Sequence, residues 1–212
     1  MNNKQSLTYW KTKAKSNPTI KTSKVSDIND FSDYDKDFIL QYANKDTNIL
    51  DLAAGTGITL NKYYDKVKHV SAIEKFKEFS DFIVKSPNID IINSDIISYI
   101  PKEKYDLILM FGITHYFNRE ESKYLYKKYK NFLNDNGKLI VKHQFGVKED
   151  VTIEGYSEEL KCNYYSQYRQ IESEISMLKE IGFSSTICYD IYPQKCNRWN
   201  NTHFYAIVAS IQ

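Results

Sequence analysis

Short apolar runs alternate with segments of helical periodicity between residues 49 and 143. The apolar runs that predict strands cover residues 49–51, 69–74, 89–92, 105–111 and 138–143. The segments that predict helices between them cover residues 58–64, 75–84 and 120–132. Strands that alternate with helices favour a mostly parallel sheet with right-handed crossovers and helices on both faces. The run 105–111 is apolar enough for a central, buried strand of that sheet.

The pattern changes in the last third of the chain. Residues 145–168 show no clear period and are rich in tyrosine. Apolar positions at helical spacing follow from Ile171, and Gly182 is typical of the end of such a helix. The apolar runs 185–192 and 203–209 have no helix between them, which predicts a hairpin at one edge of the sheet.

Residues 1–45 precede the first predicted strand. Residues 34–42 carry apolar side chains at helical spacing. The lysines of this segment are typical of a solvated surface. The adjacent rings of Tyr9 and Trp10 need burial, however, which favours a lid that closes over a ligand. We therefore expect one domain over residues 1–212, with 1–45 as a helical lid and 145–170 as an insertion on the substrate side.

Composition and charge exclude several classes of protein. A length of 212 residues with 42% hydrophobic and 15% aromatic residues suits one globular domain. The net charge of +2 predicts no strong attraction to nucleic acid or membrane. No apolar run approaches the roughly 18 residues that a bilayer span requires. The three cysteines form no Cys-x-x-Cys pair, so we expect a reduced, cytoplasmic protein without a structural metal.

The candidate chemistry begins where the first predicted strand ends, at Asp51. A loop of small residues follows, and such a loop lets the backbone approach a ligand closely. A P-loop would need a lysine after Gly57, and a dinucleotide fingerprint would need a third glycine. The carboxylate of Asp51 would also repel a pyrophosphate, whereas it suits a ligand that carries positive charge. A plain strand-to-helix turn is the alternative.

Two further acids follow predicted strands. Glu74 lies roughly 20 residues after the loop, the spacing at which a carboxylate accepts hydrogen bonds from ribose hydroxyls in a βαβ unit. Asp95 follows the third strand beside Ile96, and this pair could bind an adenine amino group and ring. An Asx turn or a helix cap is the alternative for Asp95, and it is compatible with the adenine role.

The motif Asp51-x-Ala53-x-Gly55-Thr56-Gly57 resembles the first motif of class I S-adenosylmethionine (SAM)-dependent methyltransferases. The resemblance extends through Glu74 and Asp95 to the terminal hairpin. It implies a Rossmann-like, doubly wound, seven-stranded sheet, mostly parallel, with an antiparallel last strand. Ala53 stands where the family usually has glycine, and alanine disfavours a positive φ.

The resemblance also indicates a branch of the family. Residues 112–117, which include His115, are similar to the small-molecule branch, because the Asn/Asp-Pro-Pro-Tyr/Phe motif of enzymes that methylate nucleic-acid amino groups is absent. The chain looks like stand-alone bacterial enzymes of surface-polysaccharide or secondary-metabolite pathways. We expect a small-molecule acceptor, for which a nucleotide-sugar, a surface-polysaccharide precursor and another phosphorylated metabolite are candidates; the resemblance does not identify the substrate.

The resemblance assigns roles to named residues. SAM would be the cofactor, with S-adenosylhomocysteine (SAH) as product. Its binding residues would be Trp10, Asp51, Ala53, Gly55, Gly57, Glu74, Lys75, Asp95, Ile96 and Phe111, with Asp95, Ile96 and Phe111 on the adenine side. His115 would be the base that takes a proton from an acceptor hydroxyl. The acceptor would contact Tyr9, Tyr116, His143, Tyr168, Arg169 and Trp199.

Alternatives stay open at this point. His115 could shape the pocket without acting as a base, with His143 as the next candidate. Arg169 could lie on the surface at a helix start, and Trp199 could cap the hairpin. The chain as a whole could instead be a dinucleotide-dependent oxidoreductase, a SAM-binding module without turnover, or a methyltransferase that acts on RNA or protein. Asp51 and the absent third glycine disfavour the first, and the near-neutral charge disfavours the last.

Overall fold

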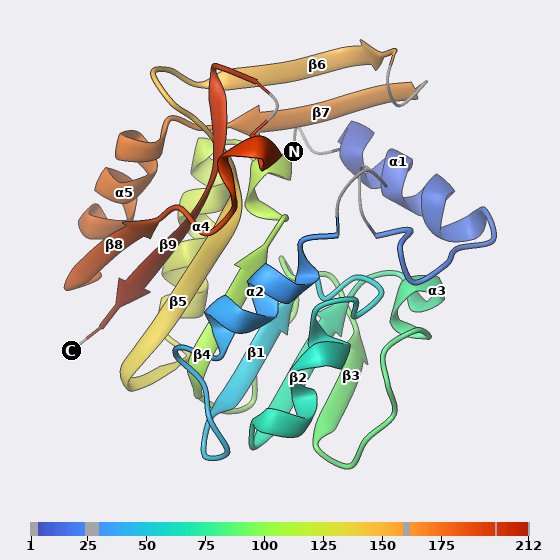
Figure 1. The fold of residues 1–212 in the computed structure, drawn as a ribbon, viewed down its shortest axis with the longest axis vertical. Helices are drawn as coiled ribbons and strands as arrows, with labels where there is room; N and C mark the ends of the chain where they lie inside the picture. Colours follow the sequence, from blue (N-terminus) through green and yellow to red (C-terminus); the bar gives the residue numbers. More distant parts are fainter. Residues whose placement is uncertain (1–3, 24–29, 159–161, 198, 212) are drawn as a thin grey trace.

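A seven-stranded sheet forms the centre of the computed structural model, which describes residues 4–23, 30–158, 162–197 and 199–211 (Figure 1). Its strand order is β3-β2-β1-β4-β5-β9-β8. The strands are β1 (Asn48–Leu52), β2 (His69–Glu74), β3 (Ile89–Asn93), β4 (Tyr105–Phe111), β5 (Leu133–Gly146), β8 (Ser185–Tyr189) and β9 (Thr202–Ser210). Neighbouring strands from β3 to β5 are parallel, whereas β9 is antiparallel to both β5 and β8. The predicted fold, with its antiparallel last strand, is confirmed.

Helices cover both faces of this sheet because side chains alternate between two cores along each strand. Leu50 and Leu52 of β1 belong to the core that packs under α4 and α5, whereas Ile49 belongs to the core under α2. The helices are α1 (Lys4–Lys15), α2 (Ser32–Ile39), α3 (Lys77–Ser80), α4 (Arg119–Lys130) and α5 (Ile171–Glu180). A capping box between Asn118 and Glu121 begins α4.

Two predicted helices are shorter than the sequence pattern indicated. Residues 58–64 form only 3-10 turns, at Leu60–Lys62 and then at Tyr64–Lys66. Within residues 75–84 only the four residues of α3 are α-helical. The side chain of Asn61 donates to the carbonyl of Phe82 and accepts from the amide of Val84, so it replaces helical partners there.

The tyrosine-rich segment without a clear period forms a second sheet. It consists of β6 (Val151–Ser157) and β7 (Cys162–Tyr168), which pair antiparallel. This hairpin lies beside α1 above the ends of the main strands (Figure 1), and the Ser6 hydroxyl donates to the carbonyl of Tyr165 at 2.6 Å. Helix α1 and the β6–β7 hairpin, which are far apart in the sequence, therefore meet above the ends of the main strands.

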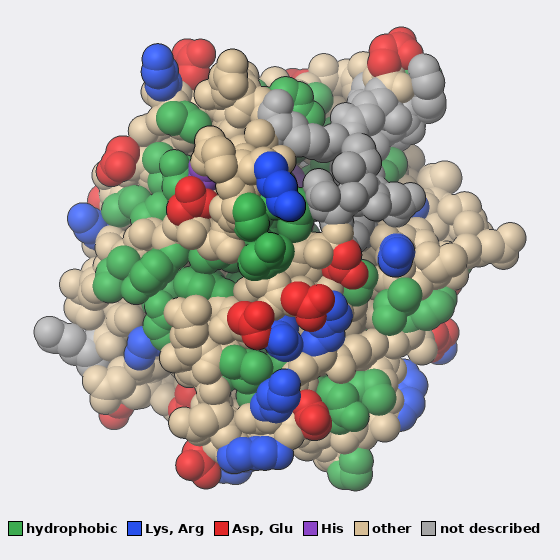
Figure 2. Space-filling model, viewed as in Figure 1, with side chains coloured by type: hydrophobic (Ala, Val, Ile, Leu, Met, Phe, Trp, Pro, Cys, Tyr) green, Lys and Arg blue, Asp and Glu red, His purple; other side chains and the backbone are tan. Residues whose placement is uncertain are grey.

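The surface carries mixed charge on the face drawn in Figure 2, where acidic and basic side chains are interspersed. Within the described ranges, no helix is long and apolar enough to cross a membrane. The same part of the chain holds no group of three or more side chains that could bind a metal ion.

Candidate functional site

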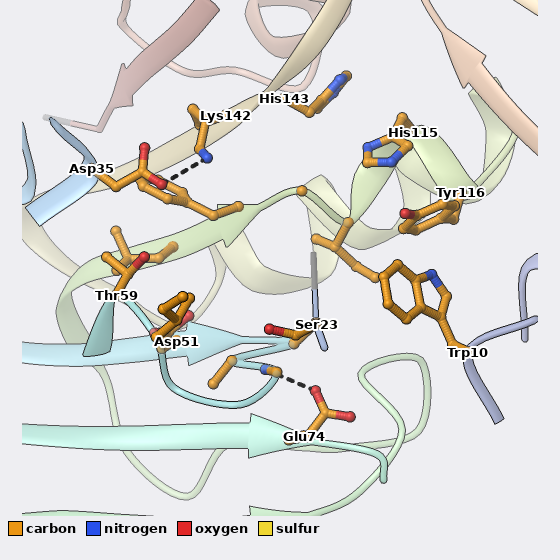
Figure 3. A pocket seen from close by; sticks show the side chains of 18 of the residues that line it. Trp10, Ser23, Asp35, Asp51, Thr59, Glu74, His115, Tyr116, Lys142 and His143 are labelled. Atoms are coloured by element: carbon orange, nitrogen blue, oxygen red, sulfur yellow. Dashed lines mark hydrogen bonds and ion pairs between the residues drawn. The ribbon is translucent and has the colours of Figure 1, made fainter. Parts of the chain in front are cut away.

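A cavity of about 420 Å³ lies at the carboxyl ends of the strands (Figure 3). The strand order reverses direction between β1 and β4, and open α/β sheets bind ligands in the crevice at such a point. The volume falls in the range of small-molecule sites. The walls come from strand tips, the loop after β1, α1, α2, the β6–β7 hairpin and the segment before β9.

Asp51 lies near the tip of β1 and is only 8% exposed. Its carboxylate accepts a hydrogen bond from the Tyr63 hydroxyl at 3.0 Å. Burial raises the pKa of Asp51 to about 6, and the bond from Tyr63 opposes that shift. No salt bridge joins Asp51 to a cation among the described residues. The side chain lines the cavity as an acid without a close cation.

Glu74 is the matching acid at the end of β2, the neighbouring parallel strand. Its two carboxylate oxygens accept from the backbone amides of Gly55 at 2.9 Å and of Phe76 at 2.8 Å. Burial raises the pKa of Glu74 to about 7, against the effect of these amides. The bond to Gly55 ties the loop after β1 to the tip of β2, as Figure 3 shows.

The loop after β1 turns through the left-handed region at Ala53 (φ 61°), Gly55 (φ 59°) and Gly57 (φ 72°). The sequence suggested that alanine would disfavour a positive φ, yet Ala53 adopts it. This conformation costs an L-residue about 1–2 kcal/mol, so the loop is locally strained there. Gly55 lines the cavity, whereas Gly57 packs on Ile83, whose Cγ1 would lie 2.8 Å from an added Cβ.

Asp95, Lys75 and Ile96 line the cavity together beyond Glu74. Asp95 pairs with Lys75 at 2.6 Å and accepts from the amide of Ile97 at 2.8 Å. The Asx turn considered for Asp95 is therefore present at the cavity wall. Phe111 also lines the cavity, at the end of β4, where the ammonium of Lys142 lies 4.8 Å from its ring centroid. Its place on the adenine side of SAM stays a prediction.

The segment before β1 reaches the cavity at three places, from α1, at Ser23 and from α2. Trp10 of α1 lines it, whereas Tyr9 packs away from the cavity against Tyr164, with ring centroids 5.4 Å apart. Ser23 also lines the cavity and lies 2.7 Å from the Thr56 hydroxyl, oxygen to oxygen. An added Cβ on Gly55 would lie 2.8 Å from the Cβ of Ser23. The predicted lid segment thus rests on the loop itself.

A buried polar cluster of three residues was missed by the sequence analysis. The ammonium of Lys142 donates to Asp35 and to the hydroxyl of Tyr192, each at 2.9 Å, and Tyr192 donates to Asp35 at 2.5 Å. The three residues come from β5, α2 and the segment after β8, and all line the cavity. The available signal was a lysine within the apolar run 138–143.

His115, Tyr116 and His143 lie at the end of the cavity opposite Asp51 and Glu74 (Figure 3). The ring of His115 lies 4.0 Å from Tyr116, 5.2 Å from His143 and 5.6 Å from Tyr168, centroid to centroid. These four residues line the cavity, and Trp199 does so as well. The structure therefore brings together most of the acceptor side chains that the sequence predicted.

Both histidines at this end are neutral imidazoles. Burial lowers the pKa of His115 and of His143 well below the usual value, and the nearby charge of Arg169 lowers them further. His143 Nδ1 lies 2.6 Å from the carbonyl of Gln144, which can only accept, so Nδ1 carries the proton. His143 Nε2 and His115 Nδ1 have no hydrogen-bond partner among the described residues.

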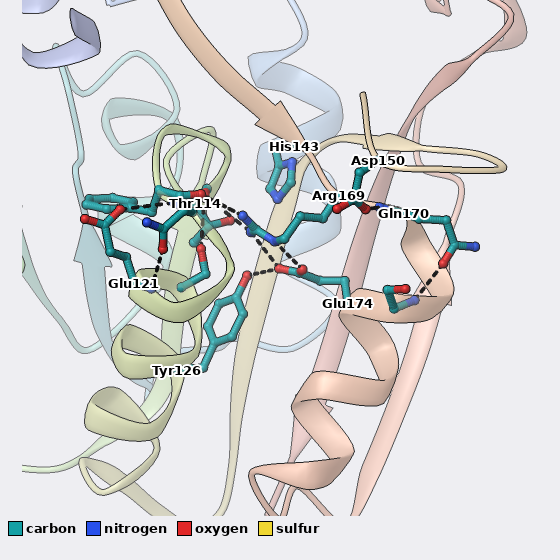
Figure 4. A network of polar contacts seen from close by, with 12 residues as sticks. Thr114, Glu121, Tyr126, His143, Asp150, Arg169, Gln170 and Glu174 are labelled. Atoms are coloured by element: carbon teal, nitrogen blue, oxygen red, sulfur yellow. Dashed lines mark hydrogen bonds and ion pairs between the residues drawn. The ribbon is translucent and has the colours of Figure 1, made fainter. Parts of the chain in front are cut away.

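Arg169 is not at the cavity wall, which corrects both sequence-based interpretations of it. The side chain is fully buried, and its guanidinium donates to Glu174 at 2.6 and 2.9 Å (Figure 4). It also donates to the carbonyls of Thr114 and Phe117, at 3.3 and 2.8 Å. Arg169 therefore holds the turn that carries His115 against α5, because those carbonyls flank the histidine.

Solved structures that are similar to this chain share its fold at low sequence identity. A SAM-dependent methyltransferase from Leishmania major aligns with a TM-score of 0.72 and 16% identity, over 95% of this chain and 82% of that one. DhpI in complex with SAH aligns with a TM-score of 0.73 and 13% identity, over 99% and 97%. The fold is that of class I methyltransferases.

The glycopeptide N-methyltransferase MtfA, solved with SAH, has the same fold, with a TM-score of 0.66 and 11% identity over 87% of this chain and 91% of that one. No protein-family model matches the sequence, and no curated protein matches it. At these identities the likeness establishes the fold alone.

Proposed function

We propose that this protein binds SAM and transfers its methyl group to a small-molecule acceptor. The observation that carries the proposal is the pair of buried acids, Asp51 and Glu74, at the tips of adjacent parallel strands beside a glycine-containing loop. Neither has a cation within salt-bridge distance among the described residues. Solved proteins of this fold, DhpI and MtfA, hold SAM or SAH.

The residues at the cavity fit the parts of SAM. Asp51 offers a carboxylate to the ammonium of the methionine end. Glu74 accepts one amide on each oxygen, and a carboxylate oxygen has a second lone pair that can accept from a ribose hydroxyl. Asp95 and Ile96 offer an acceptor and an apolar surface to the adenine. Lys142 and Asp35 supply paired charge near Asp51, whose pKa they affect in opposite directions.

His115 is proposed as the base. When bound, SAM supplies an electrophilic methyl group. His115 lies on the carboxyl-end rim after β4, lines the cavity and is neutral, so it can accept a proton from an acceptor hydroxyl. Arg169 holds the turn that positions it. Segments 1–45 and 145–170 would close over the bound ligands, because both contribute cavity walls.

Isothermal titration calorimetry with SAM tests the proposal. The wild-type protein should bind SAM, and Asp51→Asn and Glu74→Gln should each weaken binding by about tenfold or more, since each removes a hydrogen bond to a charged group. Glu103→Gln, an exposed acid before β4, is the matched control and should bind normally. Normal binding by both site variants, or binding of NADH in place of SAM, would contradict the assignment.

A further inference from the structure

The acceptor end of the cavity is a mostly aromatic enclosure. Tyr116, Tyr164 and Tyr168 contribute rings there, and His115 and His143 lie beside them. Tyr116 is 5% exposed and its hydroxyl accepts from Tyr164 at 3.2 Å, so its ring is fixed in place. Rings held edge-on or offset to one another favour a planar aromatic ligand over a flexible polar one.

Both lysines that line the cavity already have an anionic partner. Of the described residues that line it, only Lys75 and Lys142 are cationic, and none is arginine. Lys75 pairs with Asp95 at 2.6 Å, and Lys142 pairs with Asp35 at 2.9 Å. A phosphate group carries up to two negative charges, and its burial beside these pairs would require one of them to break. The cavity therefore disfavours the phosphorylated acceptors that were candidates from the sequence.

His115 is the residue at this end that can accept a hydrogen bond from a ligand. It lines the cavity and is 8% exposed. Its Nδ1, like His143 Nε2, is enclosed by protein and has no hydrogen bond to the described residues, so the ring nitrogen that a ligand in the cavity can reach is Nε2 of His115. A hydrogen bond to that nitrogen would add about 0.5–1.5 kcal/mol to the affinity of the ligand. A hydroxyl on an aromatic ring matches both the imidazole and the ring-lined wall.

We infer that the acceptor is an uncharged phenol, bound with its ring against Tyr116 and Tyr168 and its hydroxyl at His115. This inference rests on the proposed function and narrows its substrate class. In the reaction, the phenol oxygen bonds to the methyl carbon and the carbon–sulfur bond breaks, leaving its electron pair on sulfur. The phenolic proton passes to the imidazole of His115, so the positive charge lost at sulfur appears there.

The electrostatics of the site agree with a phenol. Burial and the neighbouring positive charges lower the pKa of His115 well below its usual value, which makes it a weak base. A phenol, like the tyrosine side chain, has a pKa near 10, whereas the pKa of an aliphatic alcohol, like that of water, is far higher. The imidazole can therefore take a phenolic proton at a far smaller energetic cost.

Calorimetry with three probes of similar shape tests the inference. The probes are 2-naphthol, 2-naphthyl phosphate and the saturated alcohol 2-decalol, each titrated into protein that is saturated with SAH. We expect 2-naphthol to bind about tenfold or more tightly than either of the others, which corresponds to one good hydrogen bond or one uncompensated charge. Tighter binding of the phosphate, equal binding of 2-decalol, or no binding of 2-naphthol would overturn the inference.

A variant isolates the role of the histidine. His115→Phe keeps a ring but removes the acceptor nitrogen, so it should weaken 2-naphthol binding and leave 2-methoxynaphthalene, which has no hydroxyl to donate, unchanged. His69→Phe at the start of β2 is the matched control. Equal losses for both ligands in His115→Phe would overturn the hydroxyl contact. SAH binding is measured first: its absence contradicts the proposed function, whereas normal SAH binding without 2-naphthol binding contradicts only the acceptor class.

Discussion

Buried charges are paired in the core beside the acceptor end of the cavity, whereas two buried acids at the opposite end of the cavity are unpaired within the described part of the chain. Beneath the acceptor end, the cation of Arg169 and the anion of Glu174 are both fully buried and joined by two hydrogen bonds. At the other end, Asp51 and Glu74 are almost as deeply buried, yet neither has a cation in contact among the described residues. The first arrangement fixes a turn in place. In the second arrangement Asp51 and Glu74 remain without a cation from the described residues, so a ligand can bind them through positive charge or hydrogen-bond donors.

Paired buried charges stabilise the folded chain, whereas buried acids without a cation are available to bind a ligand. Loss of a partner from a buried pair leaves an uncompensated charge and is strongly destabilising. Loss of an acid that is buried without a cation removes a desolvation penalty, so the free protein becomes more stable while binding suffers. Measurements of stability should therefore separate the two ends by sign.

The largest effect is expected at the paired end. Arg169→Met should lower the free energy of unfolding by about 3–5 kcal/mol, because Glu174 would remain buried without its cation. Urea denaturation measures this change. Arg119→Met, an exposed arginine at the start of α4, is the matched control and should change stability little. A loss below about 1 kcal/mol for Arg169→Met would remove the contrast between the two ends.

A smaller effect of opposite sign is expected at Asp51. The pKa of Asp51 rises from about 3.9 in an unfolded chain to about 6 in the folded protein. The free energy of unfolding therefore falls as the pH rises from about 4 through 6, because the folded protein disfavours the ionised carboxylate. Asp51→Asn should therefore stabilise the ligand-free protein by about 2 kcal/mol at pH 8. The gain should disappear near pH 4.

Thermal or urea unfolding of the wild-type protein and of Asp51→Asn at both pH values gives the comparison. Glu103→Gln serves as control, since this exposed acid has no burial to relieve. If Asp51→Asn destabilises the protein at pH 8 as much as at pH 4, then the buried acid is compensated in the free protein. In that case the two ends of the cavity do not differ in the way described.

The smallest effect concerns the strained loop. Ala53→Gly should stabilise the protein by about 0.5–1 kcal/mol, because glycine adopts φ 61° without the steric penalty that alanine has there. The greater entropy of glycine in the unfolded chain offsets part of this gain. The neighbouring Ala54→Gly should instead destabilise it slightly. Unfolding curves of the two variants, recorded in parallel, decide the point. A loss of stability in both would mean that the loop holds no strain at Ala53.

The features that could be predicted from the sequence are those that depend on residues close together in the chain. Strands β2 and β4 begin and end as the apolar runs indicated, because buried parallel strands read as continuous apolar stretches. Asp51 and Glu74 could be found because each acid directly follows or ends such a run, and parallel strands bring those ends to one edge. The helix predicted over 75–84 is α-helical only at Lys77–Ser80, and after it the side chain of the distant Asn61 bonds to the backbone of Phe82 and Val84.

By itself the sequence determined the doubly wound sheet, the acids at its rim and the loop between them, since alternating periods and strand ends are local properties of the chain. Only the tertiary structure decided that Arg169 is a buried brace rather than a ligand, and that Lys142, Asp35 and Tyr192 meet at the cavity. It also decided that the tyrosine-rich segment is a hairpin over the site. Those outcomes depend on which segments, distant in the sequence, pack together, and the spacing of residues along the chain does not specify such contacts.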